Sequence, residues 1–166
     1  MKPQKNPNAW SCLPTAFAIS QGDKLDDWLK LIGHDGSEIV RAGLPDPICR
    51  KGFHPNEMIY LCVGANFAVT RIELVSQATP GGQYVPTVFD TGGERPFLYQ
   101  MFNSRGVLDV RTATGVGHAL SYEGCGGDAI ICDPATGKVF EFRGLEDTSK
   151  RGIFITALWR IDEMKE

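Results

Sequence analysis

The sequence predicts an α+β fold, with N-terminal helices packed on a C-terminal antiparallel β-sheet. Up to about residue 66, apolar residues recur at the three- and four-residue spacing of helices. From about residue 67 onward, short runs rich in β-branched and aromatic residues alternate with turns rich in glycine and proline. The chain has 166 residues and no internal repeat, so we expect residues 1–166 to form one domain.

The composition is that of an ordinary globular protein, with 42% hydrophobic residues, 22% charged residues and a net charge of -3. Nucleic-acid recognition usually leaves a basic patch, so this charge argues against a nucleic-acid partner. No apolar run approaches the ~20 residues of a membrane span, and no apolar segment follows the charged N-terminus. We therefore expect no membrane partner and no secretory signal.

The five cysteines do not form a recognisable metal-binding or disulfide pattern. None belongs to a Cys-x-x-Cys pair, and no set of histidines or carboxylates completes a ligand group around them, so we expect no metal and no cofactor. Reduced thiols in a cytoplasmic protein are the expected state. The cysteines are Cys12, Cys49, Cys62, Cys125 and Cys132.

Three helices are expected in the N-terminal part. The first opens at Cys12 and ends at Ser20-Gln21-Gly22. The second follows Asp23 as its N-cap and stops at Gly33, and the third covers about 54–63 before Gly64-Ala65-Asn66 breaks it. The second helix has one apolar stripe, formed by Leu25, Trp28, Leu29 and Ile32.

Six strands are expected in the C-terminal part, and a short helix at 97–103 separates the first strand from the other five. The segment 76–96 is predicted to be a long irregular loop, and such loops are often functional. Together with the polar loop at 33–39, it is the expected specificity surface. The predicted strands are 67–74, 107–111, 117–123, 129–133, 138–142 and 153–159.

Cys12 is the candidate nucleophile because it opens a helix. The first turn of a helix has unpaired N–H groups and the positive end of the macrodipole, and both favour the thiolate, which is the attacking species. A cysteine at a helix start is also a common core residue. The local sequence alone leaves these two interpretations of Cys12 open.

His118 is the candidate base among three histidines. His34 lies in a polar turn, and His54 precedes a proline at a helix start, where capping explains it. His118 begins a predicted strand, and Asp133 ends the neighbouring strand of the same hairpin, so the carboxylate can orient the imidazole. The structural alternatives are a hydrogen-bonded strand histidine and, for Asp133, the turn sequence Asp-Pro-Ala-Thr-Gly.

These segments resemble the papain-like cysteine peptidases, most closely the bacterial and phage branch that includes the bacteriocin-leader-processing peptidases. NAWSCLPTAFAI, at 8–19, is similar to their nucleophile segment, and GHALSYEG…AIICDPATGKVFEF, within 117–142, to their histidine strand and aspartate turn. The resemblance implies a papain-like fold and a Cys12–His118–Asp133 catalytic triad.

The chain also departs from the family pattern. Leu13 stands where the family usually has glycine, and no glutamine lies at the usual spacing before the cysteine. In the family that glutamine helps to hold the oxyanion. Gln4 and Asn6 are the two alternatives here, each acting with the backbone N–H of Cys12. A polar surface loop is the structural explanation of both residues.

The resemblance implies a hydrolase, a thiol protease that acts on a protein or peptide substrate, such as a host protein, in the cytoplasm of a bacterial or phage-infected cell. Two alternatives stay open. A transglutaminase-like acyltransferase or amidase uses the same order of cysteine, histidine and aspartate and differs only in the acceptor. A non-catalytic phage or bacterial protein-binding module on the same fold would need none of this chemistry.

Overall fold

The computed structural model describes residues 1–7, 11–33, 55–74, 76–78, 84–86 and 94–164. It has an α+β fold with a six-stranded antiparallel sheet, in the order β1-β8-β4-β5-β6-β7, and a separate β2–β3 pair. The helices are α1 (Cys12–Gln21), α2 (Leu25–Leu31), α5 (Pro55–Gly64), α6 (Glu94–Phe102) and α7 (Leu145–Lys150). The strands are β1 (Phe67–Glu73), β2 (Ser76–Ala78), β3 (Tyr84–Pro86), β4 (Arg105–Thr112), β5 (Gly117–Gly124), β6 (Ala129–Asp133), β7 (Lys138–Glu141) and β8 (Ile153–Glu163).

Helix α1 has the predicted bounds and lies in the interior of the domain. Every residue from Leu13 to Ser20 is buried, as expected for an apolar helix enclosed on most sides. Gly22 ends the helix with a φ of 77°, and its N–H donates to the carbonyl oxygens of Ala18 and Ile19. The predicted stop at Gly22 is therefore confirmed.

Helix α2 buries its predicted apolar stripe, but the expected N-cap is wrong. Lys24, not Asp23, occupies the cap position, and its side chain makes no capping hydrogen bond. Instead the Leu25 N–H donates to Oε1 of Gln4 at 3.0 Å, and Nε2 of Gln4 donates to the Asp23 carbonyl oxygen at 2.7 Å. The Gln4 side chain thus provides the capping hydrogen bond at the start of α2 that was expected from Asp23.

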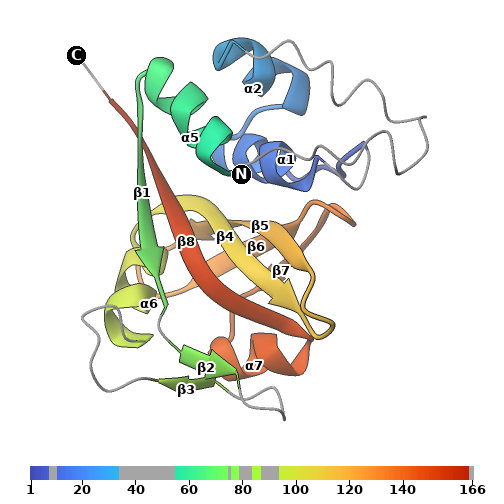
Figure 1. The fold of residues 1–166 in the computed structure, drawn as a ribbon, viewed down its shortest axis with the longest axis vertical. Coiled ribbons are helices and arrows are strands. Elements are labelled where there is room, and N and C mark those ends of the chain that lie inside the picture. Colours follow the sequence, from blue (N-terminus) through green and yellow to red (C-terminus); the bar gives the residue numbers. More distant parts are fainter. Residues whose placement is uncertain (8–10, 34–54, 75, 79–83, 87–93, 165–166) are drawn as a thin grey trace.

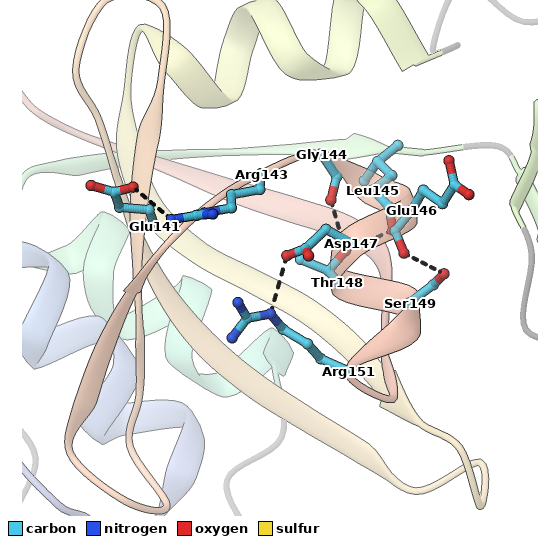
Figure 2. A network of polar contacts seen from close by, with 9 residues as sticks. All are labelled: Glu141, Arg143, Gly144, Leu145, Glu146, Asp147, Thr148, Ser149 and Arg151. Carbon is cyan, nitrogen blue, oxygen red and sulfur yellow. Dashed lines mark hydrogen bonds and ion pairs between the residues drawn. The ribbon is translucent and has the colours of Figure 1, made fainter.

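All six predicted strands are present, and two segments differ from the prediction. The expected loop 76–96 contains β2, β3 and the start of α6, and helix α7 was not predicted at all. Helix α7 is short and polar, without the apolar stripe that marks a helix in a sequence. Its one apolar residue, Leu145, is buried in a cluster with residues of the sheet. Polar contacts lie along the helix: Arg151 pairs with Asp147 at 3.1 Å, and the Thr148 hydroxyl donates to the Leu145 carbonyl oxygen at 2.9 Å (Figure 2).

The large sheet separates two layers, each with its own apolar cluster (Figure 1). Helices α1, α2 and α5 cover one face, where Val107 and Ala119 point, and α6 and α7 cover the other, where Leu108 and Leu120 point. We call these the helical face and the opposite face. Period-two alternation along β4 and β5 thus supplies both clusters.

Some expectations fall on parts of the chain that the structure does not describe. His34, His54, Cys49 and the loop residues 34–39 lie outside the described residues. No helix among the described residues is long and apolar enough to cross a membrane.

Candidate active site

Cys12 occupies the first position of α1 and is half-buried against the cluster of the helical face. The preceding Ser11 is fully buried, and its carbonyl oxygen accepts the first helical hydrogen bond, from the Thr15 N–H at 3.0 Å. The backbone N–H groups of the first turn have no carbonyl partners within a helix. Cys12 therefore stands at the positive end of a buried helix, with part of its side chain open to solvent.

The β5–β6 hairpin brings His118 and Asp133 together. In its register Ser121 lies opposite Cys132. His118 is three residues before Ser121 and Asp133 one residue after Cys132, so both side chains leave the hairpin on the same side. Nε2 of His118 lies 2.7 Å from Oδ1 of Asp133, and the two side chains are 20% and 26% exposed.

Asp133 also organises the turn that follows it. Its Oδ1 accepts the Ala135 N–H at 2.9 Å, and its carbonyl oxygen accepts the Gly137 N–H at 2.7 Å. The turn chemistry considered as an alternative for Asp133 is thus present, and it coexists with the contact to His118. Because the turn fixes the carboxylate, the carboxylate can fix the imidazole in one orientation.

Cys12 completes this arrangement from the helical layer. The His118 ring is hydrogen-bonded to Asp133, and Cys12 lies close enough to the ring to favour its charged form. Since Nε2 faces Asp133, Nδ1 is the ring nitrogen left for Cys12. A buried hydrogen bond from the Ser121 hydroxyl to the Ala16 carbonyl oxygen ties β5 to α1 nearby.

The electrostatics of the site favour a charged imidazole. Burial alone would lower the pKa of His118, but the hydrogen bonds and charges of Asp133 and Cys12 outweigh it and raise that pKa to about 9. Burial would also raise the pKa of Asp133, yet the bonds from His118 and the Ala135 N–H lower it. At neutral pH the site therefore holds an imidazolium beside a carboxylate.

The structure separates the two candidates for the oxyanion. Both amide hydrogens of Gln4 are engaged, by the carbonyl oxygens of Asp23 and Lys2, so this side chain is committed to the start of α2. Asn6 lies along the turn that carries Asp133, as does the backbone of Gln4, whose carbonyl carbon would be 3.4 Å from a Cβ atom at Gly137. The Asn6 N–H donates to the Pro134 carbonyl oxygen at 2.7 Å, and its side-chain oxygen is shielded from solvent.

The other described cysteines differ from Cys12 in their surroundings. Cys62 is fully buried, as the sequence predicts for a core residue, and burial raises its pKa to about 12. Burial also raises the pKa of Cys132, whereas Cys125 is exposed on the surface. Among the described residues, no group of histidine, cysteine and carboxylate side chains is arranged to hold a metal ion.

Ser121 is a structural contributor that the sequence analysis did not single out. Its signal is a small polar residue inside an apolar strand, three positions after His118. A larger side chain there would separate β5 from α1, because Ser121 is fully buried against Ala16.

Comparison with protein-family models finds no match for this chain, and comparison with curated proteins finds none either. The likeness to papain-like peptidases therefore rests on the short segments around Cys12, His118 and Asp133. What the site does has to be inferred from its geometry and chemistry.

Proposed function

We propose that the protein is a thiol hydrolase of the cysteine-peptidase type, which cleaves a peptide or isopeptide bond. One observation carries this proposal: the His118 ring bonds to Asp133 at the end of β6 and interacts with Cys12 at the start of α1. Helix α1, near the start of the chain, and the consecutive strands β5 and β6 thus supply the three side chains. A nucleophile, a base and a group that orients the base are the parts that thiol catalysis needs.

The proposed reaction begins from a Cys12 thiolate beside a His118 imidazolium. The sulfur attacks the carbonyl carbon of the substrate, and the carbonyl oxygen takes the negative charge of the tetrahedral intermediate. His118 then gives its proton to the leaving amine, and the acyl group stays on Cys12 as a thioester. His118, now neutral, takes a proton from water as the water attacks the thioester, which releases the acid and restores Cys12.

The proposed oxyanion donors are the backbone N–H of Cys12 and the side-chain amide of Asn6. The N–H groups of the first helical turn have no intrahelical acceptor, which leaves them available to a developing negative charge. Asn6 is favoured over Gln4 because it lies six residues before Cys12, at the usual spacing of the family's glutamine, and its backbone is bonded to the turn after Asp133.

A papain-like arrangement is part of the same proposal. It is supported by a helical layer that supplies the thiol and an antiparallel sheet that supplies the histidine and the aspartate (Figure 1). Fold likeness alone does not establish an activity, so the contacts of His118 are the stronger support.

Alkylation with iodoacetamide at about pH 6 tests the proposal, because an ordinary thiol is hardly ionised there. We expect Cys12 to react much faster than the exposed Cys125, which serves as an internal reference in the same chain. The advantage should be lost in His118→Ala and reduced in Asp133→Asn. Equal, slow labelling of Cys12 and Cys125 in the wild type would refute an activated thiol and favour a binding module.

The acceptor of the acyl group is a separate question, since hydrolysis and acyl transfer share the Cys–His–Asp set. Incubating the protein with a casein substrate and a fluorescent primary amine separates them. New peptide termini without amine incorporation would support hydrolysis. Incorporation of the amine that depends on Cys12 would instead indicate the transglutaminase-like alternative.

A further inference from the structure

Arg111 lies beside Gly117, the residue before His118 at the start of β5, and has no carboxylate partner among the described residues. It is exposed on β4, directly opposite Gly117 of β5. Four other arginines, Arg71, Arg143, Arg151 and Arg160, each lie within 4.0 Å of a carboxylate. No carboxylate among the described residues forms such a pair with Arg111, so its guanidinium can bind an anionic group from outside.

Gly117 fixes where this guanidinium lies. A Cβ atom at Gly117 would be 3.2 Å from Nη1 and 3.8 Å from Cζ of Arg111 and, its two chain neighbours aside, would meet nothing else in the described structure within 4 Å. The guanidinium therefore lies over the backbone of Gly117, in space that a side chain would otherwise occupy. Gly117 is the residue immediately before His118.

The register of β5 places this cation in front of α1. Gly117, Ala119 and Ser121 form one row on the helical face. Ser121 bonds to Ala16 in the second turn of α1, and Ala119 packs in the cluster that contains Leu13. Since α1 begins at Cys12, we expect Gly117, at the far end of this row, to lie past the N-terminal end of the helix.

We infer that Arg111 is a specificity residue that binds a carboxylate of the substrate close to the bond that Cys12 attacks. This inference rests on the proposed function and names the substrate class, a peptide with an acidic side chain or a terminal carboxylate at the site. The planar guanidinium matches a carboxylate in a two-point hydrogen bond. It also adds to the positive potential of the His118 imidazolium at the mouth of the site.

Two matched pairs of alkylating probes test this inference without knowledge of the natural substrate. The first pair is N-iodoacetyl-β-alanine, which presents a terminal carboxylate, and its amide, which lacks one. The second pair is N-iodoacetylglutamic acid α-amide, which presents a side-chain carboxylate, and N-iodoacetylglutamine amide, which lacks one. The quantity measured is the acid-to-amide ratio of alkylation rates at Cys12, divided by the same ratio at Cys125.

We expect this ratio to be about ten for at least one pair of probes, which is the gain that one charge-assisted hydrogen bond supplies. The pair that shows the preference identifies the source of the carboxylate. In Arg111→Gln the preference should disappear, because the guanidinium that binds the carboxylate is removed.

Arg105→Gln is the matched control, since Arg105 is an exposed arginine at the other end of the same strand. It should change the ratio by less than about twofold, as a distant surface charge does. An unchanged ratio in Arg111→Gln, or an equal loss in Arg105→Gln, would overturn the inference. The proposed function fails separately, if the neutral amide probe alkylates Cys12 no faster than Cys125.

Discussion

His118 is the residue at which the chemistry and the stability of the domain meet. Its pKa rises to about 9 although burial opposes its charge, because Asp133 and Cys12 favour the imidazolium. Such perturbed groups concentrate at functional sites. The raised pKa also makes the stability of the fold depend on pH, since the imidazole has its ordinary pKa of 6.5 in the unfolded chain.

The charge of His118 should therefore stabilise the folded protein in a defined pH range. Its contribution is complete below the unfolded pKa of 6.5 and is lost as the pH rises through about 9. We expect the free energy of unfolding of wild type to exceed that of His118→Asn by on the order of 2 kcal/mol more at about pH 6 than at about pH 10. Urea denaturation at both pH values measures this difference. A difference between the two proteins that does not change with pH would contradict the charged imidazole.

Asn6 should affect the reaction without affecting the thiol. If its amide stabilises only the oxyanion, Asn6→Ala should lower kcat/KM by about 10²–10³. The rate of alkylation of Cys12 by iodoacetamide should stay within about twofold of wild type, because alkylation forms no oxyanion. A parallel loss of alkylation would show instead that Asn6 positions Cys12 or His118.

At the scale of elements, the N-terminal segment joins the helical layer to the sheet. Gln4 satisfies the start of α2, while Asn6 is bonded to the turn between β6 and β7. A local change at either residue should therefore have a distinct effect, on stability for Gln4 and on catalysis for Asn6.

Replacement of Gln4 by Ala should lower the free energy of unfolding by about 1–2 kcal/mol, because the Leu25 N–H loses its acceptor and the Asp23 carbonyl its donor. The labelling rate of Cys12 should be unaffected. Gln21→Ala is the control, since the Gln21 amide bonds only to the neighbouring Ser20 hydroxyl in the described structure and should cost less. Loss of Cys12 reactivity in Gln4→Ala with a normal melting temperature would return Gln4 to the active site.

The pairing of β4 with β8 depends on the lack of a side chain at Gly106. A Cβ atom there would collide with the carbonyl oxygen of Trp159 on β8, which is backbone and has no free rotation. We expect Gly106→Ala to lower the free energy of unfolding by more than about 2 kcal/mol. Gly127→Ala, where a Cβ atom meets nothing within 4 Å, should be nearly neutral. Thermal unfolding of the two variants provides the comparison.

At the scale of the whole molecule, the sequence predicts the layers well because both depend on periodic apolar patterns. The α1 bounds, the α2 stripe and the alternating strands follow from residues such as Trp28 and Leu120. The proximity of His118 and Asp133 follows from hairpin geometry, since the open ends of two strands joined by one turn lie side by side.

The remaining features depend on contacts that no local pattern records. The capping of α2 comes from Gln4, which lies 21 residues before Leu25. Helix α7 contributes a single apolar residue, Leu145, to the cluster of the opposite face, and one residue forms no stripe that a sequence pattern could reveal. The approach of Cys12 to His118 requires α1 to lie on β5, and a small residue at Ser121 permits this. Such long-range packing has no signature in sequence spacing.

The protonation state of His118 is the most direct test of the proposed Cys12–His118 pair. Nitrogen-15 NMR of the imidazole at about pH 7.5 distinguishes the imidazolium from the neutral ring. We expect both ring nitrogens to be protonated in the wild type, and the pKa of His118 to fall once Cys12 has been alkylated with iodoacetamide, because Cys12 then no longer favours the charged ring. A neutral ring at that pH, unchanged by alkylation of Cys12, would contradict the pair and with it the proposed catalytic site.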